Sequence, residues 1–228
     1  MDPELLLHRH LSHQLGRWPP RRGLDVVGSP LRTRPGWDGS TRTVWGVATP
    51  DAAVLSVPPA VAEQVQALGD ELSCLADPAW GAALAELVAR PGGQVGTGVF
   101  RSIGPRGLPD LPDAGSWLSV DDPRVPSWLQ PFRGPALVAL DEHGAYGAGV
   151  GLKRHDEYGW EIAVVTEPAL RGRGVARRLV VQAARAVLAQ GRAVTYLHAP
   201  DNAASAHVAE AAGFPVRGWR VVGLWGGD

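Results

Sequence analysis

The alternation of apolar and polar residues is most regular in the second half of the chain, where it predicts strands followed by a long helix. Three short apolar runs are separated by turns of glycine and charged residues, which predicts an antiparallel meander. These runs are Ala136–Leu140, Gly147–Leu152 and Trp160–Val165. After a glycine-rich bend at Arg171–Gly174, apolar residues recur at helical spacing as far as Gln190, and Gly191 ends the predicted helix.

The rest of this half completes a mixed pattern of strands and helices. Further strands are predicted at Ser116–Val120, Val194–His198 and Arg220–Leu224. Shorter helices are predicted at Pro126–Phe132 and Ala203–Ala212.

The first half has a weaker pattern. Leucines predict a helix over Leu5–Leu15, whereas the Pro-, Arg- and Gly-rich stretch Trp18–Asp38 is expected to lack regular structure. Strands are then predicted at Thr43–Val47, Ala53–Val57 and Gly92–Gly104, and helices at Pro58–Leu68 and Pro78–Val88. Prolines and glycines dominate Pro105–Gly115, so we place a domain boundary there. Residues 1–115 are expected to form an α/β region of unknown role, and residues 116–228 a second domain.

Composition excludes several classes of partner. The 228 residues carry a formal net charge of -1, so we expect neither a nucleic acid nor a membrane as partner. Cys74 is the only cysteine, which excludes an internal disulfide and a cysteine-rich zinc site, and we expect no metal. No apolar run approaches ~18 residues, and the N-terminal sequence shows no secretory signal. We therefore expect a cytoplasmic protein.

One segment carries recognisable chemistry. Between Ile162 and Ala176 a predicted strand leads through a glycine-rich turn directly into a helix. The N-terminus of a helix presents unpaired N–H groups and a positive dipole end, which favour a phosphate. Gly172 and Gly174 allow the backbone to come close to such a group, and Arg171 and Arg173 add positive charge. The alternative is a strand–turn–helix connection with a purely structural role.

Two motifs resemble those of the GNAT N-acetyltransferases. Arg171-x-x-Gly174-x-Ala176 matches the (Gln/Arg)-x-x-Gly-x-(Gly/Ala) signature, at the junction between the predicted fourth strand and third helix. A second set follows in the family's order and spacing, comprising Asn202, Ser205, Gly213 and Phe214. The resemblance covers about Ser116–Leu224. It implies an α/β (α+β) fold with a mixed, mostly antiparallel GNAT-like sheet flanked by helices, and the additional N-terminal α/β region is either unrelated or a degenerate copy.

The resemblance also implies a ligand and a reaction. In the family an acyl-coenzyme A lies between the splayed fourth and fifth strands, and backbone groups of Val164, Val165 and Thr166 would hold its acyl carbonyl and pantetheine. The pyrophosphate would be held by Arg171, Gly172, Arg173, Gly174, Val175 and Ala176. Asn202 would lie beside the pantetheine arm. The implied reaction is direct attack of an amine, on a small molecule or a protein, on the thioester of acetyl-CoA.

The catalytic residues are less clear. Many relatives have a tyrosine as general acid seven residues after the asparagine, and here that position is Ala209. A thiolate is weakly basic, with a thiol pKa of about 8.5 in free cysteine, so water can protonate it. Glu161 is the first candidate for the general base, and the alternative is a strand-end carboxylate that faces solvent or pairs with arginine. His198 is the second candidate, and the alternative is a buried histidine with satisfied hydrogen bonds.

Three functions therefore remain open. The first is an N-acyltransferase that uses acetyl-CoA. The second is a non-catalytic acyl-CoA-binding module, which the absence of the tyrosine makes reasonable. The third is an α/β interaction protein in which the glycine turn is structural. Trp128 and Trp160 are candidate walls of a substrate pocket.

Overall fold

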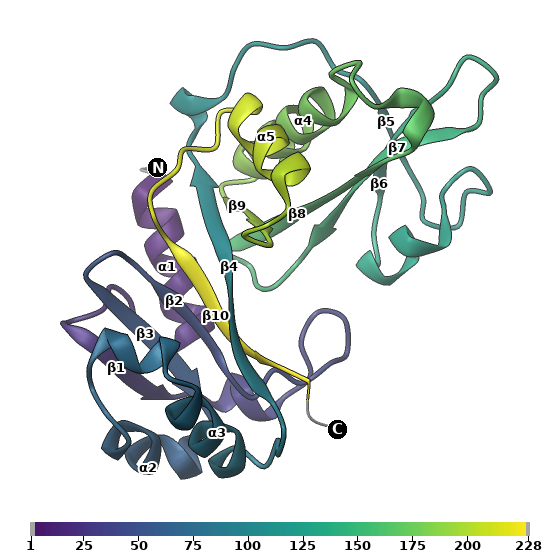
Figure 1. Cartoon of the computed structure of the whole chain (residues 1–228). Coiled ribbons are helices and arrows are strands. Elements are labelled where there is room, and N and C mark those ends of the chain that lie inside the picture. The colour runs from purple at the N-terminus through teal and green to yellow at the C-terminus, as the bar shows by residue number, and fades with distance from the viewer. Residues whose placement is uncertain (1–2, 227–228) are drawn as a thin grey trace. The chain divides into compact units, whose positions relative to one another are not determined.

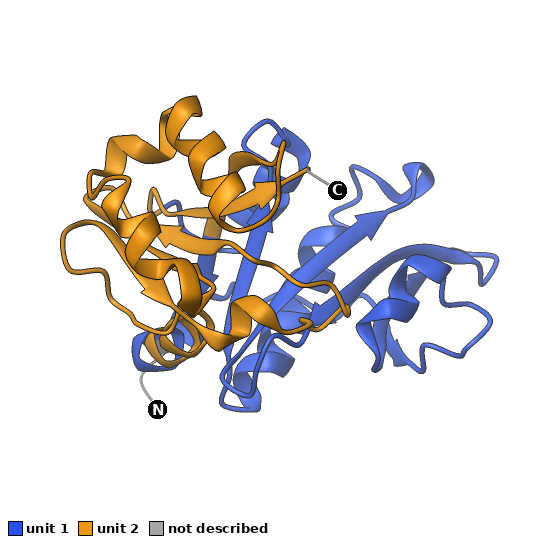
Figure 2. Cartoon of the chain, turned by 90° about the horizontal axis from the view of Figure 1, so that it is seen from below, with its two compact units in different colours: residues 1–7, 101–216 blue, residues 8–100, 217–228 orange. Residues whose placement is uncertain are grey.

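The computed structural model describes residues 3–226, which divide into two compact units (Figure 2). One unit contains residues 3–7 and 101–216, and the other contains residues 8–100 and 217–226. The chain therefore returns to the second unit at its C-terminal end. The expected domain boundary within Pro105–Gly115 stays a prediction.

The unit that contains residues 101–216 is built on five strands in the order β9-β8-β7-β6-β5 (Figure 1). The strands are β5 (Ser116–Leu118), β6 (Ala136–Leu140), β7 (Tyr146–Lys153), β8 (Gly159–Thr166) and β9 (Ala193–His198). Pairing is antiparallel from β5 to β8 and parallel between β8 and β9. The predicted meander and the mixed, mostly antiparallel sheet are confirmed.

Two helices pack together on one face of this sheet (Figure 1). They are α4 (Val175–Ala189) and α5 (Ala203–Ala211), and three 3-10 helices are also present: η4 (Pro105–Gly107), η5 (Ser127–Phe132) and η6 (Pro168–Leu170). Gly191 follows α4 at φ 70°. Its N–H donates to Leu188 O at 2.9 Å and the N–H of Arg192 donates to Val187 O at 3.4 Å. These two bonds form a Schellman motif, so the predicted helix end is confirmed.

The two faces of β7 differ in side-chain size, and this difference shapes the unit. Ala148, Val150 and Leu152 are buried in the core formed with α4 and α5. Glycines alternate with them and lie on the opposite face, where η5 packs against the strand. The aliphatic face therefore holds the helices, and the glycine face admits close-packed side chains from η5.

The second unit has the strand order β1-β3-β2-β10-β4. Its strands are β1 (Gly23–Gly28), β2 (Trp45–Ala48), β3 (Ala52–Val57), β4 (Gln94–Ile103) and β10 (Arg220–Trp225). Its helical segments are η1 (Pro30–Thr33), η2 (Pro59–Val61), α2 (Ala62–Ala67), η3 (Leu72–Ala76) and α3 (Pro78–Leu87). The helix α1 (Pro3–Leu15) and the strand β4 contribute residues to both units.

The expectation that Trp18–Asp38 lacks regular structure is wrong. Residues Gly23–Gly28 form β1, which pairs in parallel with β3 over its whole length. Leu24, Val26 and Val27 are buried. The partner strand lies about thirty residues away in the sequence, so the local pattern of prolines and arginines conceals the pairing.

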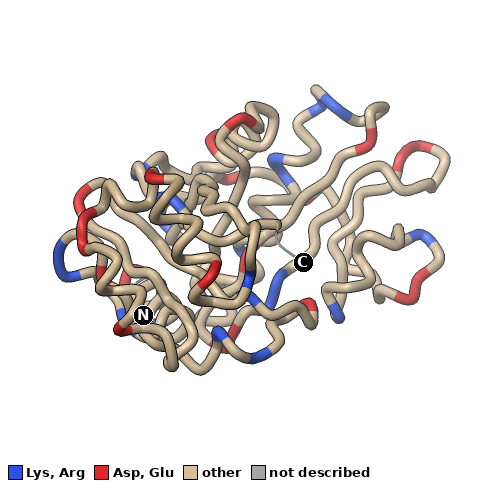
Figure 3. Tube along the Cα trace, turned by 60° about the horizontal axis from the view of Figure 1, so that its bottom comes forward, with Lys and Arg blue, Asp and Glu red and all other residues tan. Residues whose placement is uncertain are grey.

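Residues of both charge signs are scattered along the trace (Figure 3). This distribution agrees with the near-zero net charge of the sequence. Within residues 3–226, no helix is long and apolar enough to cross a membrane.

Candidate functional site

The parallel strands β8 and β9 are neighbours only at their beginnings. Their pairing ends with Ile162 opposite Tyr196, although β8 continues to Thr166 and β9 to His198. Among the described residues no further pair joins the two strands. Beyond Ile162, β8 therefore has no strand partner on the β9 side, where alternate residues (Val164 and Thr166) present free backbone groups. The side chain of Val165, on the face of the sheet, is 43% exposed.

A glycine turn connects this free edge to α4. Gly172 and Gly174 have φ angles of 73° and 70°, in the left-handed region that favours glycine. A Cβ at Gly172 would meet no atom within 4 Å, and one at Gly174 would meet only an Arg177 nitrogen at 3.9 Å. Gly174 is the N-cap residue of α4 and provides no side chain to cap it. The space before the first N–H groups of α4 is therefore open to an anion.

Arginine side chains surround the turn. Arg171 donates from Nε to the carbonyl oxygen of Thr166 at 3.1 Å and thereby fastens the turn to the end of β8. Arg171 and Arg173 are both exposed, whereas Val175 is buried in the core below the turn. Ala176 is half-buried. The predicted phosphate-binding segment is therefore an exposed, positively charged loop anchored by one buried helical residue.

The end of β8 also carries an unsatisfied polar atom. The hydroxyl oxygen of Thr166 is buried and has no hydrogen-bond partner among the described residues. Buried polar side-chain atoms usually have such a partner. An orphaned hydroxyl next to a free strand edge and an open helix N-terminus fits a site that a ligand completes.

Asn202 lies at the same edge of the sheet, because parallel strands end on the same side. It is exposed and is the N-cap of α5, where its Oδ1 accepts a hydrogen bond from Ser205 N at 2.9 Å. Its amide NH₂ group donates to no other described residue and can donate to a ligand. The structure therefore brings Asn202, the free edge of β8 and the glycine turn to one edge of the unit.

Glu161 is buried at the start of β8 in a small charged cluster. Its carboxylate is paired with the ammonium of Lys153, directly opposite on β7, and lies 3.1 Å from Nε2 of His155. Burial raises the pKa of Glu161, but the hydrogen bond from His155 and the charge of Lys153 outweigh it and lower the pKa to about 2. This arrangement resembles the ion-pair alternative, with lysine in place of arginine, and makes Glu161 a weak proton acceptor.

His198 is buried at the end of β9 and both of its ring nitrogens are engaged. Nε2 accepts a hydrogen bond from Arg101 Nε at 3.1 Å, and Nδ1 donates to the carbonyl oxygen of Ala199 at 2.9 Å. Arg101 also donates to Phe214 O at 3.2 Å and to a carboxylate oxygen of Glu210 at 3.1 Å. This geometry favours the alternative of a satisfied buried histidine that joins β9 to the end of α5.

Ala209, at the position of the family's tyrosine, is fully buried in the core cluster that also contains Tyr196 and Phe214. The hydroxyl of Tyr196 lies 2.8 Å from Ser205 Oγ. The ring of Tyr196 packs against Phe214 at 5.7 Å between centroids. Tyr196 is therefore a core residue that ties β9 to the first turn of α5.

The two candidate tryptophans have different environments. Trp160 lies under two guanidinium groups, from Arg154 at 4.9 Å and Arg192 at 4.6 Å. Trp128 lies on η5 and packs edge-on against Phe132, with 5.9 Å between the ring centroids. Trp128 therefore belongs to the segment that packs against the glycine face of β7.

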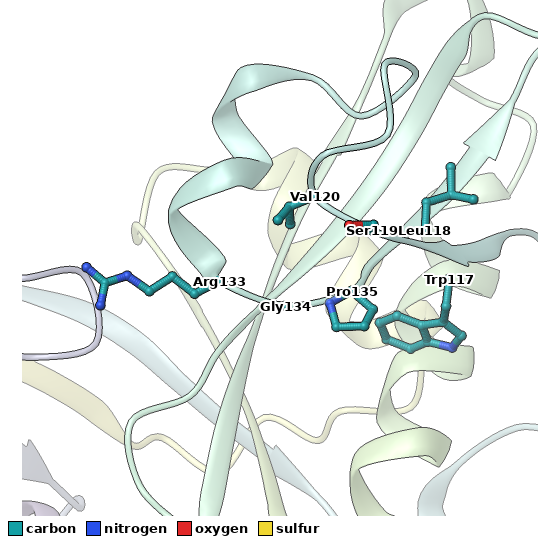
Figure 4. A pocket seen from close by; sticks show the side chains of 7 residues that line it. All are labelled: Trp117, Leu118, Ser119, Val120, Arg133, Gly134 and Pro135. Atoms are coloured by element: carbon teal, nitrogen blue, oxygen red, sulfur yellow. The ribbon is translucent and has the colours of Figure 1, made fainter.

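The structure also contains a shallow pocket that the sequence analysis did not predict. Its volume is about 420 Å³, and Figure 4 shows the rings of Trp117 and Pro135 on one side while Arg133 extends away from them. The lining residues are Trp117, Leu118, Ser119, Val120, Arg133, Gly134 and Pro135. None of the predicted site residues lines it. The pocket depends on contacts between distant segments, which no sequence motif marks.

Comparison with known proteins identifies one family. The model of the acetyltransferase (GNAT) family matches residues 108–214. Comparison with the curated proteins gives no match. A solved structure of a putative GNAT acetyltransferase from Novosphingobium aromaticivorans is similar, with 25% identity, a TM-score of 0.48, and coverage of 62% of this chain and 70% of the other. A GCN5-related N-acetyltransferase-like protein from Streptococcus suis is similar at 16% identity, with a TM-score of 0.45 and coverage of 65% and 69%.

The family match spans the whole region from the strand β5 to the end of α5. It therefore includes the strands β8 and β9, the glycine turn and Asn202. Residues 108–214 of this chain form a domain of the GNAT acetyltransferase family.

Proposed function

We propose that this protein is an N-acyltransferase that transfers the acetyl group of acetyl-CoA to an amine, carried by a small molecule or a protein. One observation carries the proposal: the pairing of β8 and β9 ends at Ile162 and Tyr196, so that a free strand edge leads into an open helix N-terminus. A strand edge matches the amides of pantetheine, and a helix N-terminus matches a pyrophosphate. Both features follow one another within residues 163–175 of the family domain.

In this proposal each predicted binding residue has a stated task. Backbone groups of Val164, Val165 and Thr166 bind the acyl and pantetheine part of the substrate. The turn Arg171–Gly174, with the N–H groups of Val175 and Ala176, binds the pyrophosphate, and Asn202 donates to the pantetheine arm. The open space at both turn glycines and the orphaned hydroxyl of Thr166 support this assignment.

The reaction proceeds in the ternary complex. The nitrogen of the neutral amine attacks the thioester carbonyl carbon, a C–N bond forms, and the C–S bond then breaks. The nitrogen loses one proton and the departing thiolate gains one, so that an amide and free coenzyme A are produced. Because Glu161 is held as an ion pair and His198 has both nitrogens engaged, we assign these two proton transfers to water.

A non-catalytic acyl-CoA-binding module is the second candidate, and Ala209 at the position of the usual tyrosine favours it. Thermal unfolding with acetyl-CoA or coenzyme A tests both candidates together. A ligand at about a hundred times its dissociation constant adds ~2.7 kcal/mol, which raises the Tm of a chain of this size by about 5–10 °C. The absence of any rise with a folded protein rules out both. A rise without acetylation of any amine in a broad screen favours the binding module.

A further inference from the structure

The glycine face of the family domain carries an aromatic cover that the sequence motifs do not mark. A Cβ at Gly151 would lie 2.7 Å from the ring of Phe132, and one at Gly149 would lie 3.0 Å from Cε2 of Tyr146. Real Cβ atoms essentially never come within 3.0 Å of such a neighbour and rarely come within 3.4 Å, so glycine at both positions lets the two rings lie close to the strand. Trp128 packs edge-on against Phe132 and completes the cover.

Tyr146 extends across this face to the part of β8 that lies beyond its pairing with β9. Gly149, beneath its ring, is paired with Val165 on β8, and residues opposite each other in an antiparallel pair have their side chains on the same face. The hydroxyl of Tyr146 lies 3.4 Å from the carbonyl oxygen of Val165. Its oxygen therefore reaches the strand segment where the pairing with β9 has ended.

The hydroxyl of Tyr146 accepts one hydrogen bond, from Trp128, and donates a second, long one to Val165. Trp128 Nε1 donates to the Tyr146 oxygen at 3.2 Å, which leaves the phenolic proton for donation. Its contact with Val165 O, at 3.4 Å, is longer than the 2.7–2.8 Å typical of O–H···O bonds. The proton can therefore turn to a better acceptor without the loss of a strong bond.

We propose that the hydroxyl of Tyr146 donates a hydrogen bond to the acyl carbonyl oxygen of the bound thioester. This inference rests on the proposed function, because it assumes that an acyl-CoA lies along residues 163–166. When the amine attacks, the carbonyl oxygen becomes an oxyanion, and a donor already aimed at it stabilises that charge. The C–S bond then breaks and the hydroxyl keeps its proton throughout.

The environment of Tyr146 suits a donor that stays protonated. Burial raises the pKa of Tyr146 to about 12, although the hydrogen bond from Trp128 lowers it in part. A phenol with this pKa does not give up its proton at neutral pH. Tyr146 is therefore assigned a role on the carbonyl oxygen, distinct from the thiolate-protonating role of the tyrosine that Ala209 replaces.

The test compares acetyl-CoA with coenzyme A, which lacks the acyl carbonyl, by calorimetric titration of the full chain. Tyr146→Phe is expected to weaken the binding of acetyl-CoA about fivefold to tenfold, which corresponds to the loss of one hydrogen bond. The affinity for coenzyme A should not change. Tyr196→Phe is the matched control, because it removes another buried tyrosine hydroxyl that bonds to Ser205, and it should change neither affinity. Unliganded thermal unfolding verifies that each variant is folded.

A spectroscopic readout makes the test independent of affinity. The infrared stretch of a ¹³C-labelled acetyl carbonyl, measured at saturation, should lie at lower frequency in the wild type than in Tyr146→Phe. Trp128→Phe keeps the hydroxyl of Tyr146 but removes the hydrogen bond that Trp128 donates to it. This variant should give a frequency between those of the wild type and Tyr146→Phe. Equal frequencies and equal acetyl-CoA affinities in wild type and Tyr146→Phe overturn the inference, as does an equal loss for both ligands. Failure of the wild type to bind either ligand instead overturns the proposed function, and the inference with it.

Discussion

The guanidinium of Arg101 donates a hydrogen bond from Nε to Nε2 of His198 across 3.1 Å, and both side chains are buried. The two residues are 97 positions apart in the sequence. Because Nε2 is the acceptor, the proton of the neutral ring is on Nδ1, where it bonds to Ala199 O. The contact therefore fixes the tautomer of His198 and leaves no ring nitrogen free for a substrate.

Replacing Arg101 with leucine should destabilise the protein by about 2–4 kcal/mol. The change leaves His198 Nε2 and Phe214 O buried without their donor, and each unsatisfied acceptor costs roughly 1–3 kcal/mol. Urea unfolding measures the effect. Arg106→Leu, at an exposed arginine of η4, is the control and should change stability by less than about 0.5 kcal/mol. Equal stability of the two variants would show that the Arg101 network contributes little.

Glu161 should make stability depend on pH in the acid range. The pKa of Glu161 is lowered to about 2 in the folded protein. In the acid range the unfolded chain therefore binds more protons than the folded protein, and the free energy of unfolding decreases as the pH is lowered. The contribution is fully present above about pH 5, is lost progressively down to about pH 2, and amounts to about 3 kcal/mol. Glu161→Gln should remove both the contribution and its pH dependence in urea unfolding from pH 7 to pH 3.

The matched control for Glu161 is Glu157→Gln, at an exposed carboxylate of the same hairpin. Its unfolding curves should follow the wild type at every pH. If Glu161→Gln also follows the wild type, the ion pair with Lys153 and His155 makes no net contribution to stability.

Two glycines at opposite ends of α4 allow the phosphate site to be tested. Gly174 and Gly191 both have φ 70° and open space around them, so a glutamate should cost similar backbone strain at each. Only Gly174→Glu places a carboxylate where the pyrophosphate is proposed to bind. We therefore expect Gly174→Glu to abolish the Tm rise caused by acetyl-CoA and Gly191→Glu to retain it. An unchanged rise in Gly174→Glu would place the pyrophosphate elsewhere.

Introducing the family's tyrosine at position 209 should destabilise the protein. Ala209 is fully buried in a packed core with Tyr196 and Phe214, so Ala209→Tyr inserts a large ring without room and should cost about 3 kcal/mol or more. Ala204→Tyr, at an exposed position of the same helix, should be nearly neutral. Chemical unfolding of the two variants provides the comparison. A stable Ala209→Tyr would show that the core can open at this position.

The sequence predicted the parts of the fold that local patterns control. The strands β6, β7 and β8, the helix α4 and its end at Gly191 all follow from apolar spacing and glycine positions within about ten residues. The strand β1 was missed because its pairing with β3 is long-range. The site divides in the same way. The turn at Gly172 and Gly174 is a contiguous motif, whereas the hydroxyl of Tyr146 meets Val165 only because two strands pair in one register.

The cluster at Glu161 has a consequence for work with reactive thioesters. Lys153 is the only lysine of the chain, and its ammonium is paired with that buried carboxylate. A protonated, ion-paired ammonium is a poor nucleophile. The protein therefore offers acetyl-CoA almost no lysine of its own to modify, so acetyl groups that appear on an added amine will stand out against a low background of self-labelling.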